Sequence, residues 1–124
     1  IIIHQINIRY TMSQINREIN QYWVHFQSGK TERNKIYPRA IIKCYHDDEF
    51  LVQLNFYSEK RTLPATYHDE KFDLIYLRYP ISMYANILDI LRNEKPIYFS
   101  YSPKTNLGFI RTGKEPVGEG EEAL

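Results

Sequence analysis

The chain has 124 residues, of which 43% are hydrophobic and 25% are charged, and its formal net charge is +1. This composition is typical of a folded globular protein and excludes a disordered or fibrous chain. The length suits one domain, which we assign to residues 1–117, with residues 118–124 as a flexible acidic tail. The small net charge argues against a protein that binds nucleic acid through charge alone.

The tyrosine and cysteine contents indicate the type of fold and the cellular compartment. The 11 Tyr residues favour a fold rich in strands with half-buried faces. The lone Cys44 excludes an intramolecular disulfide, and its neighbours Ile42 and Tyr45 indicate a buried thiol within a strand. No apolar run approaches the length of a membrane span. We therefore expect a cytoplasmic protein that makes no membrane contact.

The first elements combine two periodicities. Residues 2–10 alternate in polarity, which predicts a half-buried strand. The next segment repeats apolar residues every three or four positions, which predicts an amphipathic helix from Thr11 to Gly29. The capping-box spacing of Thr11 and Gln14 supports its start, and Gly29 its end. The apolar stripe consists of Met12, Ile15, Ile19, Trp23 and Phe26.

The middle of the chain predicts a hairpin followed by a less regular segment. Residues 36–46 and 50–57 alternate and flank the polar turn at 46–49, as paired strands do. Residues 58–70 contain Pro64 and charged runs, which indicate an edge strand or a loop. Residues 72–79 alternate again, and Pro80 ends that strand.

A second helix and a second hairpin complete the chain. Ser82 is a candidate N-cap for a helix that ends near Asn93, and residues 97–101 and 107–112 predict two strands. The order is βαβββαββ. We therefore expect an α+β fold in which two amphipathic helices cover one mainly antiparallel sheet of about six strands.

The last hairpin is the main candidate for function. Ile97, Phe99 and Tyr101 share one face of the first strand, and Tyr98 and Ser100 share the other, where we also expect Gly108, Ile110 and Thr112. Our first hypothesis is a non-catalytic binding or assembly module that contacts another protein or a second copy of itself. Its candidate binding residues are Tyr98, Tyr101, Arg111, Lys114 and Glu115, with Trp23 as a further exposed anchor.

A second hypothesis is nucleic-acid binding by a basic surface that carries tyrosines. Lysine and arginine hold phosphates, and aromatic rings stack on bases. A solvated protein face explains the same lysines equally well. The candidate residues are Lys30, Arg33, Lys35, Tyr37, Arg39 and Lys43.

A third hypothesis is a metal-dependent hydrolase, because two turns each place a histidine beside carboxylates. Imidazole and carboxylate ligands suit zinc, manganese or iron ions, and polar turns also collect these residues for purely structural reasons. The candidate ligands are His46, Asp48, His68 and Asp69. No glycine-rich phosphate loop or nucleophile turn is present in the sequence, so we expect no cofactor.

Overall fold

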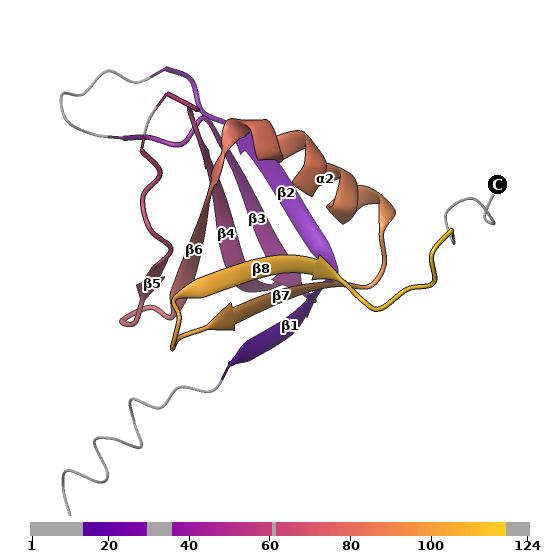
Figure 1. Ribbon diagram of the computed structural model, residues 1–124. Coiled ribbons are helices and arrows are strands. Elements are labelled where there is room, and N and C mark those ends of the chain that lie inside the picture. Colours follow the sequence, from indigo (N-terminus) through magenta and orange to yellow (C-terminus); the bar gives the residue numbers. More distant parts are fainter. Residues whose placement is uncertain (1–13, 30–35, 61, 119–124) are drawn as a thin grey trace, which may run out of the picture.

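Strands are the main secondary structure of the protein in the computed structural model, which describes residues 14–29, 36–60 and 62–118 (Figure 1). The described elements, in chain order, are β1 (Ile15–Ile19), β2 (Gln21–Phe26), β3 (Ala40–His46), β4 (Glu49–Tyr57), β5 (Tyr67–Asp69), β6 (Leu74–Pro80), the 3₁₀ helix η1 (Ile81–Met83), α2 (Tyr84–Asn93), β7 (Ile97–Ser102) and β8 (Leu107–Thr112).

The strands form two sheets rather than the single sheet that we expected. The smaller sheet has the order β1-β7-β8, and the larger has the order β2-β3-β4-β6-β5. Every pair is antiparallel except β4 and β6, which are parallel. The mainly antiparallel character is confirmed, whereas the expected number of strands and their union in one sheet are wrong.

The helix predicted from Thr11 to Gly29 is wrong within its described part. Residues 15–19 and 21–26 are β1 and β2, separated by Asn20, and they join different sheets. Asn20 shifts the alternation of side chains by one position. The apolar residues that pack on the core are Ile15 and Ile19 in β1 and Tyr22 and Val24 in β2, and the spacing of four and three between the first three imitates a helix. Phe26 is 68% exposed. The strand predicted over residues 2–10 lies outside the described residues.

The amides of Asn20 and Gln21 hold the turn between β3 and β4. Asn20 Nδ2 donates to Asp47 Oδ1 at 2.7 Å, and its Oδ1 accepts from the Asp47 backbone N–H at 2.9 Å. Gln21 Oε1 accepts from the Asp48 backbone N–H at 2.6 Å. Asp47 and Asp48 have φ of 45° and 69°, as a tight hairpin turn requires. The β1–β2 corner is thus fixed to the hairpin beside it.

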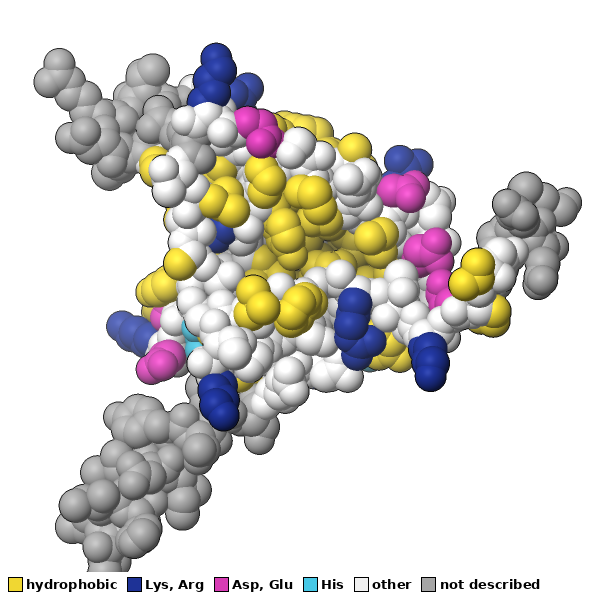
Figure 2. Space-filling model, viewed as in Figure 1, with side chains coloured by type: hydrophobic (Ala, Val, Ile, Leu, Met, Phe, Trp, Pro, Cys, Tyr) yellow, Lys and Arg dark blue, Asp and Glu magenta, His cyan; other side chains and the backbone are white. Residues whose placement is uncertain are grey.

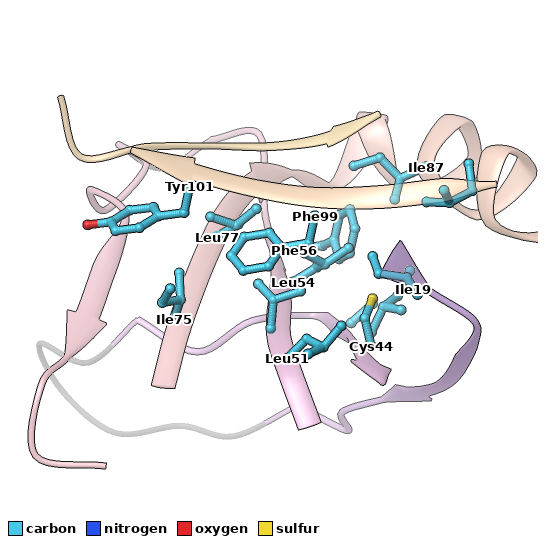
Figure 3. Close-up of a cluster of buried hydrophobic side chains, with 14 residues drawn as sticks. Ile19, Cys44, Leu51, Leu54, Phe56, Ile75, Leu77, Ile87, Phe99 and Tyr101 are labelled. Carbon is cyan, nitrogen blue, oxygen red and sulfur yellow. The ribbon is translucent and has the colours of Figure 1, made fainter. Parts of the chain in front are cut away.

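The core lies between the two sheets and is closed at one end by α2. Figure 3 shows Leu54, Phe56 and Leu77 of the larger sheet lying opposite Phe99 and Tyr101 of the smaller sheet. Further buried members of the cluster are Ile19, Ala40, Ile42, Cys44, Leu51, Val52, Ile75, Ile87 and Ile97. The prediction that Cys44 is a core thiol is confirmed, because its side chain is fully buried.

The later elements follow the sequence pattern closely. The 36–57 hairpin is present as β3 and β4, although its first strand begins at Ala40. The strand ending at Pro80, the second helix and the two last strands are also present. Residues 58–70, for which we expected an edge strand or a loop, contain the short edge strand β5. Ser82 lies within η1 and does not cap α2, whose N-cap position is Met83 without a side-chain hydrogen bond. Among the described residues, no helix is long and apolar enough to cross a membrane.

Candidate functional site

Strands β7 and β8 pair in a register that reverses part of our expectation. Tyr98 pairs with Arg111, and Tyr101 pairs with Gly108. Because directly paired residues share a face, Gly108, Ile110 and Thr112 face the core with Tyr101. The prediction that these three residues lie on the Tyr98 face is therefore wrong. The outer face of β8 carries Leu107, Phe109 and Arg111 instead.

Arg111 organises the outer face of the smaller sheet. Its guanidinium carbon lies 4.7 Å from the ring centroid of Tyr98. Its Nη2 donates to Asn16 Oδ1 at 2.8 Å, and its Nε donates to Ser100 Oγ at 3.2 Å. The Ser100 hydroxyl also donates to Asn16 Oδ1 at 2.8 Å. Arg111 of β8 is thereby connected across β7 to β1.

Two large apolar side chains lie exposed on the same face. Leu107 is 50% exposed and Phe109 is 47% exposed, at alternate positions of β8. Such side chains, gathered beside an ordered arginine, are typical of protein interfaces. Our sequence analysis missed both residues. The sequence did contain one indication of them, because apolar residues in 107–110 occupy both faces of the predicted strand. A strand with one face in solvent usually carries polar residues on that face.

The outer edge of β8 has no neighbouring strand in the smaller sheet. The N–H of Gly113 donates to the carbonyl of Pro96 at 3.2 Å, so odd-numbered residues of β8 direct their backbone groups toward β7. By alternation, Gly108, Ile110 and Thr112 direct their N–H and C=O groups away from β7. They present an open strand edge.

Most of this edge is unoccupied. The Thr112 carbonyl accepts a bond of 3.2 Å from Arg111 Nη1. Within the described ranges, no hydrogen bond involves the N–H groups of Gly108, Ile110 or Thr112. Exposed strand edges of this kind accept additional strands from other chains.

An apolar area adjoins this edge. Figure 2 shows hydrophobic side chains gathered between β8 and α2, with further hydrophobic and basic side chains along β8. The elements that border the area contribute half-buried apolar residues that pack on the core: Tyr79, Ile81, Tyr84 and Ile110. The open edge, the apolar area and the outer face that carries Tyr98, Leu107, Phe109 and Arg111 together form one surface, which we call the β8 surface.

The β8 surface is also basic. Residues 95–114 include Lys95, Lys104, Arg111 and Lys114 and contain no Asp or Glu, although Glu94 and Glu115 flank this range. Glu18, which lies on the same face two strands away, faces His46 with a separation of 3.9 Å between Glu18 Oε1 and His46 Nδ1. The hairpin therefore offers positive charge close to apolar side chains.

The structure separates the binding residues that we predicted. Tyr98 and Arg111 lie together on the β8 surface, and Lys114 and Glu115 follow the end of β8. Tyr101 is only 3% exposed, so its prediction as an exposed anchor is wrong. Its hydroxyl donates to Asn106 Oδ1 at 2.7 Å, and burial raises its pKa above the ordinary value for tyrosine.

The predicted basic cluster is also divided. Lys30, Arg33 and Lys35 lie outside the described residues. Tyr37 and Arg39 line an open pocket of about 860 Å³ whose other lining residues are Gln27, Ser28, Gly29, Ile36, Pro38, Ser58, Lys60 and Thr62.

Lys43 belongs instead to the outer face of the larger sheet. Its Nζ lies 4.9 Å from the ring centroid of Trp23, which is 43% exposed. Trp23 Nε1 donates to the Tyr45 hydroxyl at 2.7 Å. Strand pairing places five residues in one row across this sheet: Trp23, Lys43, Gln53, Tyr76 and Tyr67.

The predicted metal ligands do not assemble. His68 Nε2 lies 3.0 Å from Asp73 Oδ1, and His46 Nε2 lies 3.4 Å from Asp47 Oδ2, so each histidine pairs within its own turn. Asp69 Oδ1 accepts the backbone N–H of Lys71 at 3.1 Å, as a turn residue does. No group of three His, Cys, Asp or Glu side chains suited to a metal ion occurs in the part of the chain that the structure describes.

We also compared the chain with known proteins. Neither protein families, nor curated proteins, nor solved structures gave a match to it.

Proposed function

We propose that this chain is a non-catalytic module that binds another protein through the β8 surface. The observation that carries the proposal is the pair Leu107 and Phe109, which are half exposed on the outer face of β8, a strand with no neighbouring strand on its second edge. Burial of one large apolar side chain contributes about 1.5–3 kcal/mol. Two such side chains with Arg111 beside them supply the usual anchors of an interface.

Site-specific photocrosslinking tests this proposal. A photoreactive phenylalanine analogue at position 109 is expected to give a discrete crosslinked product in cells that express the protein. The same analogue at Asn86, an exposed polar position of α2, serves as the control and gives none. Absence of any product from positions 107 and 109 would remove the proposal.

Self-association through the same surface is measured separately. Light scattering over a range of concentrations shows whether the mass rises above that of one chain. If the partner is a second copy, Phe109→Ser abolishes this rise. Phe72→Ser, which removes a ring that is 65% exposed in another region, leaves it unchanged. Equal effects of both substitutions would indicate nonspecific association.

A second candidate function is binding of single-stranded nucleic acid by the larger sheet. The row from Trp23 to Tyr67 combines aromatic rings, an amide and a lysine, and it contains no carboxylate. Tyr67 and Tyr76 are stacked with ring centroids 5.9 Å apart. Aromatic and basic side chains on a sheet surface can stack bases and neutralise phosphates.

Trp23, the single tryptophan, provides the assay for this second function. Titration with oligothymidylate or oligouridylate is expected to quench its fluorescence, with an affinity that falls as salt rises. Lys43→Met is expected to weaken the binding, whereas Lys104→Met on the β7–β8 turn is not. Unchanged fluorescence at low salt with both oligonucleotides would exclude this function.

A further inference from the structure

We infer that the β8 surface binds its partner by strand addition, and that the bound segment is an extended peptide in which apolar and acidic residues alternate. This inference rests on the proposed function and specifies the chemistry of the partner. It arises from the juxtaposition of three features of one strand: unpaired backbone groups, an adjoining apolar area and a basic, carboxylate-free hairpin.

The backbone supplies the first part of the recognition. Gly108, Ile110 and Thr112 direct their N–H and C=O groups away from β7, so an incoming strand extends the sheet by ordinary ladder bonds. Main-chain pairing of this kind gives affinity without requiring a defined side chain at every position. The open length suits a peptide of about five to eight residues.

The pleat of the sheet divides the side chains of the peptide between two environments. Residues on the inner face enter the apolar area between β8 and α2, bordered by Tyr79, Ile81 and Tyr84. Residues on the outer face lie beside Phe109 and Arg111. Because successive residues of a strand point to opposite faces, the complementary peptide alternates between apolar and polar residues.

The charge of the hairpin selects acidic residues for the outer positions. The hairpin from Ile97 to Thr112 carries Lys104 and Arg111 and no carboxylate, and Lys95 and Lys114 at its base are adjacent to Glu94 and Glu115. Arg111 keeps its guanidinium at the surface, held by Asn16 and Ser100. A carboxylate next to it gains a charge-assisted hydrogen bond without reorganising the arginine. A lysine at the same position is repelled.

Thr112→Pro tests the backbone pairing. The N–H of Thr112 points away from β7, so proline removes a bond to the peptide and none to β7. The probe is a fluorescent peptide of about eight residues with alternating Val and Glu. We expect saturable binding to the wild type and to Thr112→Val, and a loss of about tenfold or more with Thr112→Pro. Equal binding to Thr112→Pro and Thr112→Val would overturn the inference.

Three further peptides make the result independent of how well Thr112→Pro folds. A peptide with Lys in place of Glu is expected to bind about tenfold more weakly at low salt. Backbone N-methylation at one alternate set of residues blocks the edge that faces β8, and methylation at the other set does not. Binding by both methylated peptides, binding of the Lys peptide as tight as that of the Glu peptide, or no binding of the Glu peptide at millimolar concentration would each overturn strand addition.

The outcomes also separate this inference from the proposed function. If position 109 crosslinks to a partner equally well in the Thr112→Pro background, the β8 surface binds a protein and strand addition is wrong. If neither position 107 nor position 109 gives a crosslink, the proposed function itself is wrong.

Discussion

Gly108 of β8 lies directly over Leu77 of β6, and a Cβ atom at position 108 would overlap the Leu77 side chain. Leu77 is 2% exposed, so its side chain has little room to move away. Glycine is needed at this position for close approach rather than for an unusual backbone angle. The contact brings the smaller sheet against the larger one at the start of β8.

Gly108→Ala is therefore expected to lower the free energy of unfolding by about 1–3 kcal/mol, the usual cost of overpacking a buried site. Gly29→Ala is the matched control, because a Cβ at Gly29 meets no atom within 4 Å, and it is expected to leave stability nearly unchanged. Urea unfolding measures both. Equal stability of Gly108→Ala and the wild type would show that β8 does not approach β6 this closely.

Asn20→Ala is expected to lower the free energy of unfolding by about 1 kcal/mol. Asn20 both donates to and accepts from Asp47, and these bonds connect the β1–β2 corner to the β3–β4 turn. Asn93→Ala, which removes a single exposed bond of 2.7 Å to Asp89 in α2, is the control and costs less. Both variants are measured by urea unfolding. A larger loss of stability in Asn93→Ala than in Asn20→Ala would contradict a role for Asn20 in holding the corner.

The Asn20 corner also explains the largest error in the sequence prediction. Each of the strands β1 and β2 alternates regularly, but their phases differ by one residue. Arg17 occupies a core-facing position of β1, so the apolar residues Ile15, Ile19 and Tyr22 are spaced by four and three, which is the signature of a helix. Trp23, assigned to the apolar stripe, faces outward in β2. Only the tertiary partners of each strand reveal the break.

The last hairpin was predicted as two strands, but its register was not. The register is fixed by the turn at residues 103–106, in which Asn106 has a φ of 54°. A shift by one residue exchanges the two faces of a strand. This accounts for the wrong placement of Gly108 and for the omission of Leu107 and Phe109 from the candidate site. In contrast, α2 and the 36–57 hairpin have unbroken patterns, and the prediction found both.

Arg111→Ala is expected to destabilise the protein only modestly, by about 0.5–1 kcal/mol, because the side chain is exposed. A double-mutant cycle with Asn16→Ala isolates the 2.8 Å bond between Arg111 Nη2 and Asn16 Oδ1, and a coupling of about 0.5 kcal/mol or more is expected. A cycle with Asp89→Ala in α2 serves as the uncoupled control. Zero coupling to Asn16 would mean that the guanidinium is not held across the smaller sheet.

Stability is expected to fall in alkaline solution because of the buried Cys44 and the half-buried Tyr79. Burial raises the pKa of Cys44 to about 12, and burial together with the charge of the Cys44 thiolate raises the pKa of Tyr79 to about 12. The unfolded chain loses these protons at about pH 8.5 and about pH 10. Below those pH values both side chains are protonated in the folded and in the unfolded state, so their ionisation does not lower the free energy of unfolding. Above them the unfolded state ionises first, so stability declines as pH rises toward 12.

Tyr79→Phe isolates one of these two contributions. It removes the hydroxyl that titrates, so the decline in unfolding free energy above about pH 10 is expected to become shallower, by up to about 1.4 kcal/mol for each pH unit. Tyr67→Phe removes the hydroxyl of a ring that is 50% exposed and leaves the slope as in the wild type. Urea unfolding at successive pH values measures the slopes. A decline that is identical in Tyr79→Phe and the wild type would show that the Tyr79 hydroxyl reaches solvent freely, which the packing of β6 against the core does not allow.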